Sequence, residues 1–351
     1  PEEATEHADA LCVGYAEETW PQLLRDFAKR KMEKIYKQGP ELSLTDLPFP
    51  RRDLLDKHAF LTQAVFEASR SCVHGCEFCV APSAWGRTPY QRPIDWVIED
   101  IRQFGEKKIL FVDLNLVSDK KYATALFQAL IPLKVRWFGL STVLIGHDPE
   151  LMILMARSGC RGLLLGLETV SEASLGDAQK QFNASIDYKQ LIQDLHDLGI
   201  TVNGCFAFGL DHDTPEVFEA TVQFAVDAGI DLPRFSILTP FPGTPLYHRL
   251  EAEGRILTKN WELSYGQHVV FQPRNMRVSQ LAEGHERAWK QVYGWKAMAQ
   301  RLWNARNFQP LGISANIGYR FYAHNLDRFY TCDWQINPVL PEIGVGKGGA
   351  A

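Results

Sequence analysis

The feature that most constrains the fold is an alternation of short apolar runs with longer amphipathic stretches, which begins near residue 58 of this 351-residue chain. The apolar runs occupy residues 61–69, 107–115, 134–142, 161–169, 201–209 and 234–241. The stretches between them carry helix start and stop signals, such as Pro93 with Gly105 and Pro149 with Gly159. Continuous apolar strands joined by helices predict a parallel sheet that is covered on both faces. We therefore expect an α/β fold, a partial (β/α)6 TIM-like barrel. A flat doubly wound sheet is the alternative, because periodicity does not show closure.

The segments on either side of this repeat predict a four-part organisation. Residues 1–40 contain a short apolar strand at 10–13 and a helix expected over 20–36, too little to bury a core alone. The proline-spaced residues 41–57 predict a linker, 58–250 the barrel, and 251–351 a mainly helical extension with a disordered tail.

Within that extension, residues 281–306 predict a single amphipathic helix. Trp289, Val292, Trp295, Met298 and Leu302 are expected on one face, and Lys290, Lys296, Arg301 and Arg306 elsewhere. A basic helix with tryptophans on one face could lie on a membrane surface, but we expect it to dock on the barrel instead.

Composition narrows the class of protein. The formal net charge of −5 gives no signal for nucleic acid or for an anionic membrane, and no apolar run is long enough to predict a transmembrane helix. Seven cysteines and no secretion signal argue against a disulfide framework. Cys12, Cys160 and Cys205 lie in apolar surroundings and are interpreted as buried, inert thiols. We expect a cytoplasmic protein with no nucleic-acid partner.

Three other cysteines, Cys72, Cys76 and Cys79, crowd into the loop after the first apolar run. The sites of parallel α/β folds lie at the carboxyl ends of their strands, so this loop is placed for function. Thiolates at this density favour zinc or an iron–sulfur cluster. Structural zinc has four ligands, and no second pair of suitably spaced ligands follows, while His74 is not expected to bind metal. Three cysteines would leave one iron of a four-iron cluster open to another ligand.

This CxxxCxxC spacing, with Phe78 before the last cysteine, resembles that of the radical S-adenosylmethionine (SAM) superfamily. The resemblance implies a [4Fe-4S] cluster on Cys72, Cys76 and Cys79 that binds SAM and cleaves it to a 5′-deoxyadenosyl radical. It also implies cofactor contacts at the strand ends, which we expect from Phe78, Asp113, Asn115, Ser141, Glu168, Gly204 and Pro240. Leu114 departs from the family pattern, in which an aspartate is common at that place.

The chain further resembles the cobalamin-binding subgroup of that superfamily, through Glu17 in "GYAEE" and through "LPFPRRDLL". The resemblance implies that residues 1–40 are a remnant of a Rossmann-like cobalamin domain. No Asp-x-His-x-x-Gly segment occurs, and we expect its place to lie upstream of Pro1. The subgroup's usual activity is cobalamin-dependent C-methylation of an unactivated carbon, here in a small molecule or in a lipid-like or polycyclic substrate such as those of hopanoid-type methylases. An electron donor such as flavodoxin or ferredoxin is implied.

Some aromatic residues of the extension are candidates for the wall of an apolar substrate pocket, although an ordinary core position is the favoured interpretation for any one of them: Trp289, Trp295, Tyr319, Tyr322 and Tyr330. Two alternatives to the methyltransferase stay open. One is a cobalamin-free radical SAM cyclase or rearrangement enzyme. The other is a non-catalytic zinc module with Cys160 or Cys205 as the fourth ligand.

Overall fold

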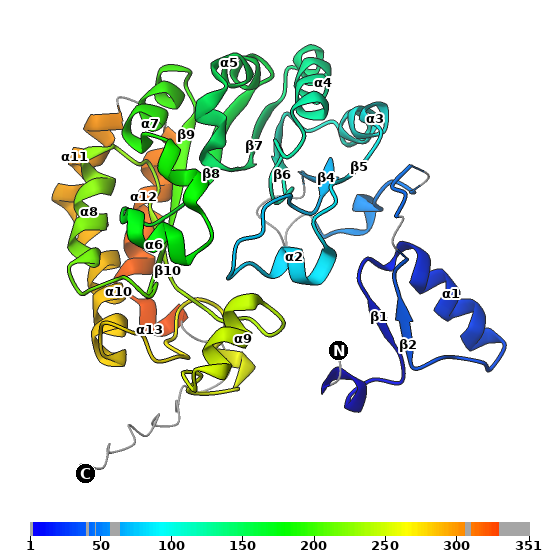
Figure 1. Cartoon of the computed structure of the whole chain (residues 1–351). Coiled ribbons are helices and arrows are strands. Elements are labelled where there is room, and N and C mark those ends of the chain that lie inside the picture. The colour runs from blue at the N-terminus through cyan, green and yellow to red at the C-terminus, as the bar shows by residue number, and fades with distance from the viewer. Residues whose placement is uncertain (1–2, 40–41, 46, 57–63, 306–309, 330–351) are drawn as a thin grey trace, which may run out of the picture.

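The computed structural model describes residues 3–39, 42–45, 47–56, 64–305 and 310–329. Its centre is a parallel sheet of six described strands in the order β10-β9-β8-β7-β6-β3 (Figure 1). They are β3 (Val65–Phe66), β6 (Lys108–Phe111), β7 (Arg136–Ser141), β8 (Cys160–Glu168), β9 (Thr201–Phe208) and β10 (Arg234–Ile237). Strand order follows chain order throughout, which makes a barrel-like sheet. A doubly wound sheet would reverse its order, so that alternative is wrong. β3 and β10 are the two edges, and the barrel is therefore partial.

Helices cover one face of this sheet (Figure 1). They are α3 (Ile94–Phe104), α4 (Lys120–Leu130), α5 (Pro149–Arg157), α7 (Tyr188–Asp197) and α8 (Val217–Asp227). Local sequence fixes their ends. Gly105 closes α3 in the left-handed conformation, as predicted, and the Asp119 carboxylate caps α4 by accepting from two main-chain N–H groups.

The two faces of the sheet differ in burial. We call the helix-covered face the outer wall and the opposite face the inner wall. Trp137 of β7 stacks on Phe127 of α4, and Phe206 of β9 contacts Phe224 of α8, so these side chains belong to the outer wall. Along β8, buried and half-buried side chains alternate from Leu163 to Glu168, because successive residues point to opposite faces.

The N-terminal residues form a separate small unit of β1 (Leu11–Val13), α1 (Ala16–Ala28) and β2 (Ile35–Lys37). The strand predicted at 10–13 is confirmed, but the helix predicted over 20–36 is wrong. The helix ends at Ala28, Arg30 follows with φ 57°, and β2 then pairs parallel with β1, which buries Tyr36.

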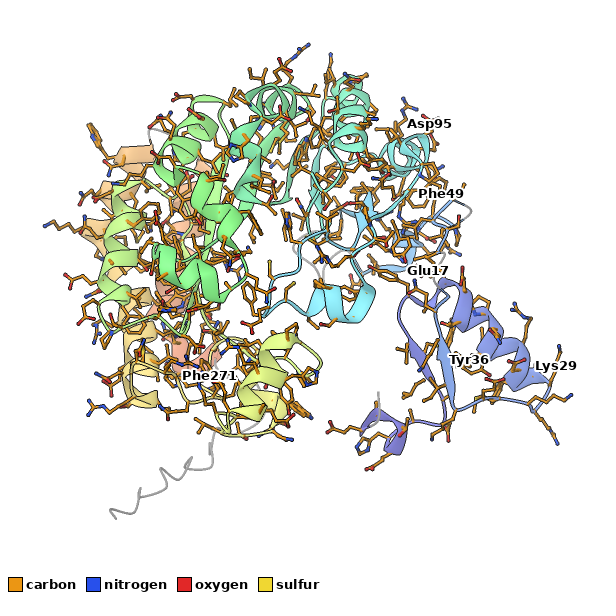
Figure 2. The ribbon with its side chains drawn as sticks, in the orientation of Figure 1. Glu17, Lys29, Tyr36, Phe49, Asp95 and Phe271 are labelled. Carbon is orange, nitrogen blue, oxygen red and sulfur yellow. The ribbon has the colours of Figure 1, made fainter. Side chains whose placement is uncertain are left out.

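This unit contacts the barrel beside a short hairpin, β4 (Ser69–Arg70) with β5 (Tyr90–Gln91), and α2 (Val80–Trp85). Glu17 pairs with Arg70 at 2.5 Å, and Figure 2 shows Glu17 at the end of the unit nearest the barrel. Tyr15 stacks on Trp85 with ring centroids 5.9 Å apart.

The C-terminal part is helical, as predicted. It comprises α9 (Pro245–Ala252), α10 (Val278–Val292), α11 (Trp295–Ala305), α12 (Pro310–Ala323) and α13 (Leu326–Phe329). One further short helix, α6 (Glu172–Asp177), lies in the barrel between β8 and α7. The predicted disordered tail lies outside the described residues. Among the described helices, none combines the length and apolarity that crossing a bilayer requires.

The single helix predicted over 281–306 is wrong, because the chain breaks at Gly294 into α10 and α11. The break turns Trp295 outward, where it is 64% exposed. Arg301, expected among the polar residues, is completely buried, and its guanidinium donates to the carbonyls of Ile230 and Asp231. Docking of α10 is confirmed by Trp289, whose indole N–H donates into β10.

Candidate active site

Three cysteines lie on one loop near the carboxyl end of the first barrel strand, as predicted. We call residues 71–79 the cluster loop. It begins at Ser71, a buried residue with φ 73°, whose hydroxyl donates to a main-chain carbonyl at 2.5 Å. Cys76 is buried, Cys72 and Cys79 are half-buried, and Cys79 occupies the N-cap position of α2. The three thiols are therefore held on a constrained loop at the functional end of the sheet.

The cluster loop is held to the rest of the barrel through its residue Glu77. The Glu77 carboxylate accepts two hydrogen bonds from Arg249 of α9, at 2.7 and 3.0 Å, in a bidentate pair. The Glu77 carbonyl accepts from Leu246 N at 3.1 Å, and the Glu77 N–H donates to Ala178 at 3.3 Å. The loop is thus tied both to the segment after β8 and to the helix after β10.

A buried ion pair lies at the end of β8. Glu168 has φ 67°, and the register with β9 shifts between Gly166 and Glu168, so a bulge re-aims the carboxylate. The Lys180 ammonium donates to Glu168 Oε1 at 2.6 Å and lies 6.0 Å from the ring centre of Phe78. A Cβ on Gly166 would lie 2.4 Å from Glu168 Oε1 and 3.0 Å from Lys180 Nζ, so the pair lies over Gly166 on the inner wall. Lys180 was missed by sequence reasoning because no local motif marks it.

The electrostatics of the loop suit a soft metal. Burial raises the pKa of Cys76 to about 11 and also raises the pKa of Cys79, so both thiols are protonated unless a cation stabilises the thiolates. Burial by itself would lower the pKa of Lys180, but the charges of Glu168 and Cys76 raise it overall. A metal that binds thiolates deprotonates them outright, so the donor set fits an iron–sulfur cluster.

Asp113 follows β6, and its carboxylate is already hydrogen-bonded to other residues of the chain. Its carboxylate accepts from the main-chain N–H groups of Ala68 at 3.1 Å and of Ser69, and from the Ser69 hydroxyl at 2.7 Å. Burial raises the pKa of Asp113 to about 6, against the opposing effect of these hydrogen bonds. In this structure Asp113 holds the corner between β3 and β4, just before the cluster loop.

The other predicted cofactor residues also lie at or near the strand ends. Asn115 and Ser141 are buried after β6 and at the end of β7, and Pro240 is buried after β10. Leu114, the departure from the family pattern, is 40% exposed beside them. Gly204 pairs with Leu165 of β8 and so lies on the outer wall, where a Cβ would lie 3.0 Å from a Leu167 side-chain carbon and 3.1 Å from Ile230. Packing of the outer wall therefore explains this glycine.

Three of the predicted pocket aromatics come together. Trp289, Tyr319 and Tyr322 line a cavity of about 390 Å³ beside β10, together with Cys205, Arg234 and Gln267 among others. Trp295 does not contribute, because it points outward on α11. Tyr330 lies outside the described residues.

The fourth ligand that a zinc module would need is not available from Cys160. Cys160 is the first residue of β8, completely buried, and its thiol lies 3.8 Å from the Gly162 carbonyl. It stands at the amino end of its strand, whereas the cluster loop lies at the carboxyl end of the sheet. Within the described ranges, no three His, Cys, Asp or Glu side chains are grouped so as to hold a single metal ion.

Comparison with known proteins decides the family. The model of the radical SAM superfamily matches residues 66–225, and a model described as a domain of unknown function (DUF4070) matches 244–337. The bacteriochlorophyllide d C-12(1)-methyltransferase of Chlorobaculum tepidum is 30% identical over 311 residues, which are 86% of this chain and 68% of that protein. The chain belongs to the radical SAM superfamily.

Two further comparisons concern a curated relative and a solved structure. The hopanoid C-2 methylase of Rhodopseudomonas palustris is 28% identical over 71% of this chain, which spans 50% of that protein. The fold is shared with the cobalamin-dependent SAM radical enzyme OxsB, solved with aqua-cobalamin and SAM. The TM-score is 0.64 at 14% identity, covering 94% of this chain and 58% of that one. The (β/α)6 expectation is thereby confirmed.

Proposed function

We propose that this radical SAM enzyme is a cobalamin-dependent C-methyltransferase that acts on a small-molecule, lipid-like or polycyclic substrate. The observation that carries the radical chemistry is the meeting of two groups that lie far apart in sequence. One is the cluster loop with Cys72, Cys76 and Cys79, and the other is the pair of Glu168 and Lys180, which lies beside Phe78. Methylation is supported by the relatives, because two of them are named as methyltransferase and methylase.

The three cysteines would hold a [4Fe-4S] cluster. When bound, such a cluster supplies the electron that splits SAM into methionine and a 5′-deoxyadenosyl radical, and methylcobalamin supplies the methyl group. The chain's own residues bind and orient. Glu168 presents a fixed acceptor to the polar groups of SAM, and Lys180 holds this carboxylate in place through the 2.6 Å ion pair. Phe78 places its ring centre 6.0 Å from the Lys180 ammonium, beside the ion pair.

Cluster binding and SAM cleavage can be tested with anaerobically reconstituted protein. We expect about four iron and four sulfide per chain and, with dithionite as reductant, formation of 5′-deoxyadenosine. Cys76→Ala should abolish that product. Cys12→Ala, which removes a half-buried thiol on β1, is the matched control and should leave it unchanged. Full activity of Cys76→Ala would contradict the proposal, and one zinc without sulfide would favour the metal-binding module.

Cobalamin dependence needs its own assay. Hydroxocobalamin is added to the protein, the free corrin is removed, and the retained corrin is measured by its visible spectrum. Retention of about one corrin per chain supports the methyltransferase. SAM cleavage coupled to a change in substrate by corrin-free protein would instead favour a cobalamin-free cyclase or rearrangement enzyme. An external electron donor such as flavodoxin or ferredoxin would replace dithionite in the cell.

A further inference from the structure

The cavity lies beside the edge strand β10, and its lining includes Cys205 and Arg234 of the inner wall as well as Phe206 and Phe235 of the outer wall. In the parallel register Gly166 of β8 pairs with Cys205 of β9, and Cys205 pairs with Arg234 of β10. Residues paired across neighbouring strands point to the same face, so the three form one row across the inner wall. Because Lys180 and Glu168 lie over Gly166, one end of the row carries the ion pair and the other carries Arg234.

The spacing of this row sets the distance between the two ends. Neighbouring strands lie about 4.8 Å apart, so two strand steps separate Gly166 from Arg234 by roughly 10 Å. Burial raises the pKa of Cys205 to about 12, and the next largest influences on it are the charges of Arg234, Glu168 and Lys180. Cys205 therefore lies within electrostatic range of both ends.

Arg234 has no counter-charge within the described part of the chain. Its side chain is exposed toward the cavity and makes no ion pair or hydrogen bond with any described residue. By contrast, Arg249 binds Glu77, and Arg255 binds Asp211. A guanidinium presents a planar fork of donors that matches a carboxylate, so an unpaired one in a cavity favours an anionic ligand group.

The far wall of the cavity is a rigid group of aromatic rings. Trp289 stacks on Tyr319 at 6.1 Å and meets Tyr322 edge-on at 5.0 Å, so each ring is held by another. Tyr319 and Tyr322 are only half-buried, which leaves ring surface facing the cavity. Gln267 adds an amide oxygen that is buried without a hydrogen-bond partner among the described residues. Such walls bind flat conjugated rings by stacking and edge contacts.

We infer that this cavity binds the substrate of the proposed reaction, and that the substrate is a planar conjugated ring system bearing a carboxylate. The ring lies against Tyr319 and Tyr322, and the carboxylate pairs with Arg234. That the ligand is a substrate rests on the proposed function, but its binding in the cavity does not depend on iron, SAM or turnover. The reacting part of the molecule would extend along the row toward the ion pair, roughly 10 Å away.

The test uses two fluorescent probes that share one ring and differ in charge, 1-pyrenebutyrate and 1-pyrenebutanol. Their binding to the protein is followed by quenching of tryptophan fluorescence, without iron or SAM. We expect the acid to bind about tenfold more tightly than the alcohol, because a hydrogen-bonded charge pair contributes roughly 1.5 kcal/mol or more. Arg234→Gln should remove this preference, and Arg234→Lys should restore part of it.

Two further variants keep the test decisive. Arg136→Gln, which changes an exposed arginine at the amino end of β7, should leave both affinities unchanged. Tyr322→Leu should weaken acid and alcohol alike, because it removes a ring but no charge. Equal affinities for acid and alcohol, or a preference that survives Arg234→Gln, would overturn the inference. Because no 5′-deoxyadenosine is measured, failure here is distinct from failure of the radical chemistry.

Discussion

Leu164 and Leu165 are neighbours on β8, yet Leu165 is completely buried on the outer wall, whereas Leu164 is half-buried on the inner wall. The same contrast runs across the sheet. The outer wall carries large apolar side chains such as Phe206 and Phe235, packed against helices. The inner wall carries half-buried or exposed side chains of mixed character, such as Leu164, Cys205 and Arg234. One face of the strands therefore packs the core, and the other is the face on which we propose that ligands bind.

The difference between the two walls is tested most directly by truncating Leu165 and Leu164 to alanine. Leu165→Ala should lower the free energy of unfolding by about 3 kcal/mol, because it opens a cavity in a packed core. Leu164→Ala is the matched control. It should cost about 1 kcal/mol or less, since solvent can reach the site. Urea unfolding followed by circular dichroism measures both. Equal losses would show that the two walls do not differ as described.

The binding role that we propose for the inner wall is tested by Glu168→Gln, which keeps the shape of the side chain and removes its charge. We expect affinity for SAM in reconstituted protein to fall about tenfold, because a hydrogen bond to a charged group is worth roughly 1.5 kcal/mol. Equilibrium dialysis with labelled SAM measures the change. Glu172→Gln on exposed α6 is the control and should bind normally. Unchanged affinity in Glu168→Gln would remove Glu168 from the cofactor site.

The smallest expected effect is a fall in the free energy of unfolding at low pH, caused by the buried side chain of His285. Burial, followed in the same direction by the nearby charge of His268, lowers the pKa of His285 on α10 to about 4, against a hydrogen bond to Phe235. The unfolded chain binds a proton near pH 6.5 and the folded chain does not, so stability falls as the pH drops below 6.5. Between pH 6.5 and 5.5 the loss should be about 1 kcal/mol.

Urea unfolding at several pH values tests this, with two histidine variants. His285→Gln should flatten the dependence on pH over that interval. His7→Gln, at an exposed position near the N-terminus, should retain it. If His285→Gln leaves the slope of unfolding free energy against pH unaltered, another group is responsible for the pH dependence.

The sequence predicted those features that depend on local signals. The strand runs, the helix ends at Gly105 and Pro149 and the three-cysteine loop are visible in short windows, because caps, turns and spacing act over a few residues. The end of α1 was missed because β2 forms only by pairing with β1. Lys180 and Arg234 were missed for the same kind of reason. Arg234 lies beside Cys205 because of strand register, and Lys180 reaches Gly166 from the segment after α6; no local pattern contains either contact.

The pair of Glu77 with Arg249 spans 172 residues of sequence. Closing so long a loop has an entropic cost that local contacts do not have. The cysteines lie in the first unit of the barrel, but their loop is tied to α9, which follows the last strand. The shape of the cysteine loop therefore depends on both ends of the barrel and reports that the whole barrel has assembled.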